Sequence, residues 1–184
     1  METYNAYSDE SLIAASLKGD EKAFGILVNR YKKMVARTVK GMLGDSVFAE
    51  DIGQEVFIKL YYSLSDFRGD AKLSTYIQRI AINLTLNEIG RRKRFFSVFT
   101  HKNDDELYDC KTNDDIESKF DARVTVEKAL ATLDSKFRII VVMRMLQGYS
   151  IKETAEILKI PTGTALSRLS RAQEQLRKYL RNNE

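Results

Sequence analysis

The segment Tyr149–Leu176, YSIKETAEILKIPTGTALSRLSRAQEQL, decides the fold that we predict for the chain. Its small and apolar residues recur at helical spacing on both sides of Pro161, the only proline of the sequence. Ser150 and Glu153 have the spacing of a capping box, which fixes the start of a helix. That helix has to end near Ile160, because a residue before proline is disfavoured in the helical region. The segment therefore predicts a helix-turn-helix.

The second of these helices has two distinct faces, and Thr162 can cap its start. The face expected to be buried consists of Ala165, Leu169, Ala172 and Leu176. The other face carries Thr164, Ser167, Arg168 and Arg171. Hydroxyl and guanidinium groups suit contacts to phosphates and base edges in a major groove, and residues 148–182 carry a net charge of +4. The pattern favours DNA binding over the simpler interpretation of a solvated helix face.

The composition of the chain argues against several other kinds of protein and site. The 184 residues are 43% hydrophobic and 30% charged, which is typical of a folded chain, and no alternating pattern predicts a strand. A single cysteine and a single histidine exclude an internal disulfide and a Cys/His zinc site. We expect no metal, no cofactor and no catalytic residues. No apolar run approaches the roughly 20 residues of a membrane span, and the first residues do not resemble a secretory signal, so the expected location is the cytoplasm.

Helical periodicity continues upstream of the quoted segment. Apolar residues recur every three or four positions over residues 24–42, with Gly41 and Gly44 expected to mark the helix end. Further stripes follow after Ser46 and after Leu73. The predicted fold class is all-α, with two small helical domains. These are an N-terminal helical bundle over 1–96, a flexible acidic linker of net charge −5 over 97–121, and a C-terminal helix-turn-helix domain over 122–184.

Two blocks of the N-terminal half carry chemistry of their own. In AEDIGQEVF, Asp51, Gln54 and Glu55 share one helix face, which on its own is typical of a solvated surface. The block FRGDAKLSTYIQRIAINLTLNEIGRRKR, residues 67–94, interleaves aromatic residues with asparagine, arginine and a basic tail. Aromatic rings and cations are what proteins use to hold unstacked bases, although Phe67 and Tyr76 also suit a core.

Together these motifs, in this order and separation, resemble a bacterial extracytoplasmic-function (ECF) sigma factor over residues 8–96 and 122–180. The resemblance implies a promoter-recognition subunit of RNA polymerase. Its partners would be core polymerase, promoter DNA and an anti-sigma factor, with the acidic linker in the nucleic-acid channel of the polymerase. The C-terminal domain would sit on the flap tip of the β subunit.

The resemblance also implies roles for individual residues. Docking on the β′ clamp helices is implied for Asp51, Gln54 and Glu55. Contact with the minus-ten element is implied for Phe67, Asp70, Lys72, Tyr76, Arg79 and Asn83. Contact with backbone phosphate is implied for Arg91, Arg92, Lys93 and Arg94. Contact with the minus-thirty-five element is implied for Arg144, Thr164, Ser167, Arg168 and Arg171. The chain departs from the family pattern at Leu166, where a basic residue is usual, so one contact to DNA is expected to be missing.

Two alternatives remain at this point. One is a helix-turn-helix regulator that binds duplex operators as a homodimer without polymerase, which would not need the face of Asp51 or the block after Phe67. The other is an enzyme such as a metal-dependent phosphodiesterase, against which the lone histidine and the lack of paired carboxylates in an apolar setting argue.

Overall fold

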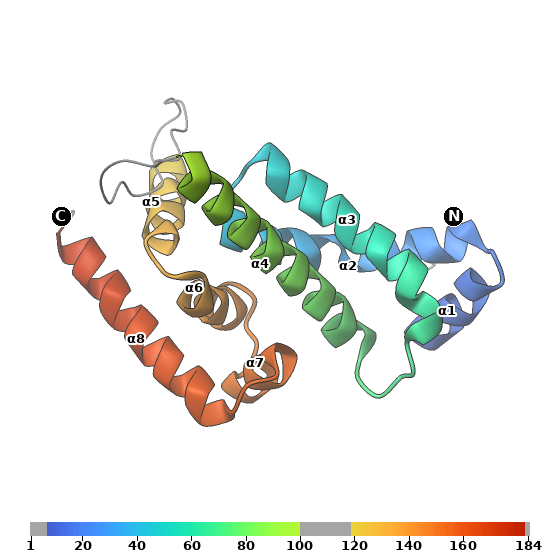
Figure 1. Ribbon diagram of the computed structural model, residues 1–184. Coiled ribbons are helices and arrows are strands. Elements are labelled where there is room, and N and C mark those ends of the chain that lie inside the picture. The colour runs from blue at the N-terminus through green and yellow to red at the C-terminus, as the bar shows by residue number, and fades with distance from the viewer. Residues whose placement is uncertain (1–6, 100–118, 183–184) are drawn as a thin grey trace.

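The protein is all-helical, as the periodicity predicts (Figure 1). The computed structural model describes residues 7–99 and 119–182, which form eight α-helices and no strand. The N-terminal half contains α1 (Asp9–Leu17), α2 (Glu21–Leu43), α3 (Val47–Ser63), a short 3₁₀ turn η2 (Leu64–Asp66) and α4 (Leu73–Phe99). The C-terminal half contains α5 (Lys119–Ala131), α6 (Ser135–Val141), a π-helical turn η3 (Val142–Leu146), α7 (Ile151–Leu158) and α8 (Thr162–Arg181).

The long helix α2 is the axis of the N-terminal half. It begins at Asp20, whose carboxylate accepts hydrogen bonds from the backbone N–H groups of Lys22 and Ala23 at 3.0 and 3.1 Å. It ends at Gly44, which adopts φ 75°. Gly41 lies within the helix, so the expectation that it marks the end was wrong. The apolar stripes of α2, α3 and α4 meet in a core that includes the fully buried residues Leu27, Val39, Val56, Leu60 and Ile77.

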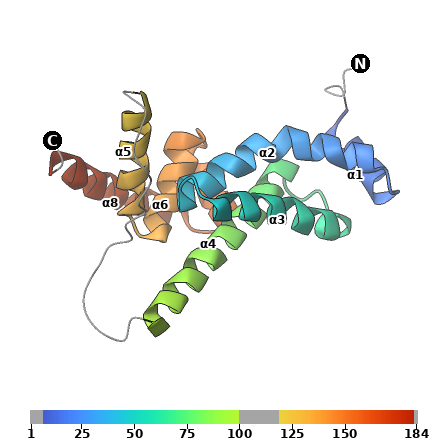
Figure 2. The same cartoon turned by 90° about the horizontal axis from the view of Figure 1, so that it is seen from above.

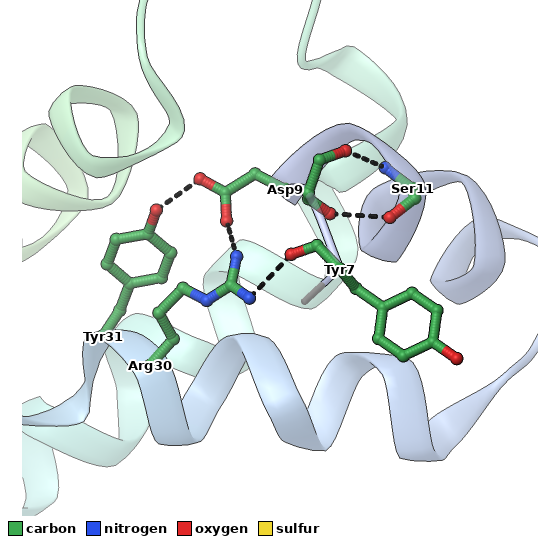
Figure 3. A network of polar contacts seen from close by, with 6 residues as sticks. Tyr7, Asp9, Ser11, Arg30 and Tyr31 are labelled. Carbon is green, nitrogen blue, oxygen red and sulfur yellow. Dashed lines mark hydrogen bonds and ion pairs between the residues drawn. The ribbon is translucent and has the colours of Figure 1, made fainter. Parts of the chain in front are cut away.

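A polar network ties α1 to α2 (Figure 3). Arg30 contacts the carboxylate of Asp9 at 2.5 Å and donates to the carbonyl of Tyr7 at 2.8 Å. The hydroxyl of Tyr31 donates to the other oxygen of Asp9. Burial of the phenol, reinforced by this hydrogen bond, raises the pKa of Tyr31 above its ordinary value. The network therefore holds α1 at a fixed place on α2.

The C-terminal half packs directly against the N-terminal half. Figure 2 shows α5, α6 and α8 gathered beside the C-terminal end of α2. One hydrophobic cluster is common to both halves, because Met42 and Ile82 pack with Ile140, Val142 and Met143. The spacing along the sequence placed Met42 in an apolar stripe but did not predict that the two halves meet.

The predicted linker differs from the structure at its margins. Helix α4 continues beyond Arg94 to Phe99, and α5 already begins at Lys119, so both ends of the segment 97–121 are helical. The remainder of that segment, residues 100–118, lies outside the described residues. Across residues 7–99 and 119–182, no helix is both long enough and apolar enough to cross a membrane.

Candidate nucleic-acid interface

The helix-turn-helix is formed by α7 and α8. The capping box is confirmed: the N–H of Glu153 donates to the hydroxyl of Ser150 at 3.1 Å, and the carboxylate of Glu153 accepts from the N–H of Ser150 at 2.7 Å. These hydrogen bonds lower the pKa of Glu153. The turn contains Lys159 in the left-handed conformation, with φ 52°. Pro161 occupies the cap position of α8 without a side-chain hydrogen bond, so the expected cap by Thr162 was wrong.

The structure places the predicted DNA-reading residues together on the outer side of α8. Ala165 and Ala172 are fully buried and let α8 pack closely on the helices beneath it, while Leu169 and Leu176 are half-buried. Ser167 and Arg171 are exposed, and Thr164 and Arg168 are half-exposed beside them. Leu166 is 52% exposed in the same region. This face can therefore present two hydroxyls, two guanidinium groups and one apolar side chain to a groove.

Arg144 has a hydrogen-bonded role outside α8. It belongs to η3, and its guanidinium donates to the backbone carbonyl of Tyr149, immediately before the capping box. Its Nε is buried without a partner among the described residues. Arg144 therefore supports the loop that leads into α7.

Four of the predicted minus-ten residues lie in or next to the loop between α3 and α4, namely Phe67, Asp70, Lys72 and Tyr76. Phe67 and Tyr76 pack against each other with ring centroids 5.3 Å apart, and the hydroxyl of Tyr76 reaches the carbonyl of Ser63 at 3.4 Å. Both rings are half-buried, so each combines a role in packing with an accessible edge. Asp70, Lys72 and Asn83 are exposed, the last of these on α4.

Arg79 differs from the other minus-ten residues because its side chain crosses to the C-terminal half. It donates from Nε to the carbonyl of Ile157 at 3.2 Å and from Nη2 to the carbonyl of Glu156 at 3.0 Å. These carbonyls belong to the last turn of α7, where the helix dipole favours a cation. The carbonyl of Glu156 also accepts the N–H of Lys159 at 3.1 Å. Lys72 also lies close enough to Glu153 to contribute to the lowering of its pKa, after the larger effects of the Ser150 hydrogen bonds.

The basic tail is partly engaged by Glu88, which is only 8% exposed. Arg91 donates to Glu88 at 2.8 and 2.9 Å, and Arg92 donates at 2.8 Å. The hydrogen bond from Arg91 makes the largest contribution to a lowered pKa of Glu88. Arg92 also lies 4.1 Å from the ring centre of Phe48, so it joins α4 to α3. Lys93 and Arg94 lie on the exposed side of the helix.

The outer face of α3 carries the predicted polymerase-docking residues. Asp51, Gln54 and Glu55 are all exposed. Ile58 and Tyr62 continue the same face and are 57% and 78% exposed. Sequence reasoning missed these two apolar residues, although their spacing from Asp51 and Glu55 was a usable signal. An exposed surface that combines acids with large apolar groups has the composition of a protein-binding site.

A metal site is absent from the part of the chain that the structure describes. No group of three or more His, Cys, Asp or Glu side chains is arranged to hold a metal ion there. The features of the described surface are the polar face of α8, the residues around the α3–α4 loop and the outer face of α3.

Comparison with known proteins assigns the chain to a family. Residues 27–95 match the family model of Sigma-70 region 2, and residues 123–176 match that of Sigma-70 region 4. The chain is 33% identical over 173 residues to the ECF RNA polymerase sigma factor SigW of Bacillus subtilis, covering 90% of this chain and 92% of the relative. The chain belongs to the ECF sigma factors.

Other relatives agree with this assignment. The sigma factor is 33% identical to the ECF sigma-E factor of Escherichia coli, over 92% of each chain. It is 31% identical to the sigma-H factor of Pseudomonas aeruginosa, over 94% of this chain and 93% of the relative. Its function is promoter-specific initiation of transcription with RNA polymerase. The match to region 2 also argues against a regulator that acts without polymerase.

Two solved structures share the fold. CnrH in complex with the cytosolic domain of CnrY has a TM-score of 0.69 and 23% identity, covering 96% of this chain and 99% of that one. The sigma factor RpoE of Bartonella quintana in complex with the anti-sigma factor NepR has a TM-score of 0.70 and 20% identity, covering 89% of this chain and 99% of that one.

Proposed function

We propose that the two halves of this sigma factor read the two promoter elements while the outer face of α3 docks on core polymerase. The observation that carries the proposal is the polar outer face of α8, which lies within the match to region 4. The proposed domains are 1–96 for polymerase and the minus-ten element, 97–121 as linker, and 122–184 for the minus-thirty-five element. The protein acts in the cytoplasm, without a cofactor and without catalysis of its own.

The proposed partners follow from the surfaces. Asp51, Gln54 and Glu55 suit a basic surface on the β′ clamp helices, and Ile58 and Tyr62 add apolar area to the same contact. The C-terminal half docks on the flap tip of the β subunit. An anti-sigma factor is a further partner, supported by the two solved structures of sigma factors in complex with the CnrY domain and with NepR.

The docking assignment is tested by the double substitution Asp51→Arg and Glu55→Arg. Both side chains are exposed, so the fold should tolerate them, whereas two reversed charges would repel a basic partner surface. We expect loss of co-purification with core polymerase and loss of run-off transcription, with an unchanged circular dichroism spectrum.

The matched control is the double substitution Glu10→Arg and Glu21→Arg, which reverses two exposed charges at the starts of α1 and α2. It changes the net charge equally but lies off the outer face of α3, so polymerase binding should persist. Equal retention of core polymerase by both double variants would refute the assignment of this face.

A further inference from the structure

A carboxylate occupies a position in the buried stripe of α4 where an apolar residue would be expected. The stripe includes Ile77, Ala81 and Leu84, which belong to the core of the N-terminal half. Glu88 follows one helical turn later on the same face and is only 8% exposed. A buried carboxylate is unfavourable unless donors or cations compensate its charge, so the stability of this site depends on the partners of Glu88.

Two arginines of the basic tail compensate this charge, and together they engage both oxygens of Glu88. Arg91 donates from Nε to Oε2 at 2.8 Å and from Nη2 to Oε1 at 2.9 Å. Arg92 donates from Nε to Oε1 at 2.8 Å. A phosphate that drew either arginine away would leave the charge of Glu88 buried and only partly compensated. DNA therefore has to compete with Glu88 for these two cations.

Arg92 is also enclosed by its surroundings. Its side chain is only 22% exposed, and its guanidinium lies 4.1 Å from the ring centre of Phe48 on α3. Its Nη2 is buried without a hydrogen-bond partner among the described residues. Arginine binds phosphate best when its planar fork of N–H groups is presented to the anion, and here the fork lies between two helices. Arg92 therefore belongs to the contact between α3 and α4.

Arg91 and Lys93 are both exposed but differ in their partners. The side chain of Arg91 is 67% exposed, yet two hydrogen bonds hold it on Glu88. Lys93 is exposed and has no ion-pair partner among the described residues. Exposure alone would count both side chains as contacts to DNA phosphate. The geometry instead separates a cation that Glu88 already neutralises from one whose charge is available.

We propose that Glu88 is a positioning residue that withholds Arg91 and Arg92 from DNA phosphate and leaves the phosphate contact of the basic tail to the cations that follow them. This inference rests on the proposed reading of promoter DNA by the N-terminal half. A cation that meets a phosphate raises the affinity for every DNA sequence alike and makes binding more dependent on salt. By holding two of the four cations in residues 91–94, Glu88 limits the sequence-independent attraction of the chain to DNA.

The first test compares Arg91→Ala with Lys93→Ala in the full chain and leaves Glu88 in place. Both side chains are exposed, so the fold should tolerate either change. Fluorescence anisotropy measures binding to a labelled duplex of random sequence over a range of salt concentrations. The slope of log K against log salt should become less negative by about 0.9 for Lys93→Ala and remain at the wild-type value for Arg91→Ala. An equal change for the two variants would overturn the inference.

The second test releases the arginines by Glu88→Gln, with folding checked by circular dichroism. The slope should become more negative by about 0.9, so that the loss of affinity between about 50 and 200 mM salt grows about 3.5-fold. Adding Arg91→Ala to Glu88→Gln should return the slope to the wild-type value, which identifies Arg91 as the released cation. The control Glu21→Gln removes an equal charge from an exposed position at the start of α2 and should leave the slope unchanged. An unchanged slope for folded Glu88→Gln, or the same change for the control, contradicts the inference.

The two proposals fail in different ways. If the wild type supports no run-off transcription with core polymerase, the proposed function fails, whereas the salt slopes still decide whether Glu88 withholds its arginines from a duplex. If transcription is normal and Arg91→Ala changes the slope as much as Lys93→Ala does, the proposed function stands and the role of Glu88 fails. Should Glu88→Gln not fold, the comparison of Arg91→Ala with Lys93→Ala decides the inference by itself.

Discussion

At the scale of single residues, Leu166 distinguishes the side of α8 that is proposed to face DNA from that of relatives with a basic residue at this position. Its side chain is 52% exposed, next to Ser167 on the face proposed to meet DNA. A leucine offers no contact to phosphate and no hydrogen bond to a base edge, but it can touch the methyl group of thymine. The upstream specificity of this sigma factor should therefore differ from that of relatives with a cation at this position.

Substitution Leu166→Lys should restore one phosphate contact. We expect tighter binding of the holoenzyme to promoter duplex, and a plot of log K against log salt whose slope becomes more negative by about 0.9. The control is Leu180→Lys, which adds the same charge near the other end of α8, where the native side chain is 43% exposed. If both variants change the slope equally, or neither does, position 166 does not face the backbone of the DNA.

The arginines show what sequence can and cannot reveal at this scale. Spacing correctly grouped Thr164, Ser167, Arg168 and Arg171, because a helix face is a local property. It could not reveal that Arg79 reaches carbonyls 77 and 78 residues away, since nothing in a local pattern encodes which helix end lies opposite. The local pattern also could not show that Arg92, for which the resemblance implies a phosphate contact, lies between Glu88 and Phe48.

At the scale of elements, α4 illustrates how one buried carboxylate organises a basic helix end. Glu88 accepts from Arg91 and Arg92 while being almost fully buried, and these hydrogen bonds lower its pKa. A group whose pKa is lower in the folded state adds stability above its ordinary pKa of about 4.3 and loses that contribution as the pH falls. The contribution of Glu88 should therefore be present at neutral pH and fade in acid.

Substitution Glu88→Gln should lower the free energy of unfolding by about 1.5–3 kcal/mol at pH 7, the usual range for hydrogen bonds to charged groups. The difference from wild type should shrink at pH 3, because the contribution of a carboxylate whose pKa is lowered in the folded state declines as the pH falls below its ordinary pKa. Urea unfolding at both pH values measures this, with the exposed Glu50→Gln on α3 as control. A difference that stays constant between pH 7 and pH 3 would contradict the role of the charged form.

The sequence predicted a helix boundary correctly where the capping residues are close in sequence. The prediction failed where a glycine serves a contact with a distant part of the chain. The capping box of Ser150 and Glu153 was found because both partners lie within one turn. Gly41 was assigned to a helix end, since glycine there is common, whereas its function is to admit Val142 from the other half. The same residue type serves both purposes, so only tertiary structure separates them.

At the scale of the whole molecule, the hydrophobic cluster shared by Met42, Ile82, Val142 and Met143 couples the stability of the two halves. Two domains that share a core unfold together, whereas two domains on a tether unfold independently. The sequence predicted both helical halves but treated them as separate, because the interface consists of residues that each half alone could have buried within itself.

Scanning calorimetry should therefore show one cooperative transition for the wild type and for Gly25→Leu. Gly41→Leu should show two transitions, because a side chain at position 41 would crowd the methyl groups of Val142 at the contact between the halves, whereas a Cβ at position 25 meets nothing within 4 Å. Coincidence of the calorimetric and van't Hoff enthalpies for the wild type checks the first statement. Two transitions in the wild type would indicate that the halves are thermally independent.

The shared cluster also has a consequence for the newly made chain on the ribosome. Met42 and Ile82 are translated well before Ile140 and Met143, which follow some 60 residues after Ile82. At bacterial elongation rates of about 5–20 residues per second, the apolar surface formed by Met42 and Ile82 together stays uncovered for roughly 3–12 s. During that interval the nascent N-terminal half exposes an apolar surface that chaperones and other nascent chains can bind. The yield of this protein is therefore expected to depend on how promptly its last helices are synthesised.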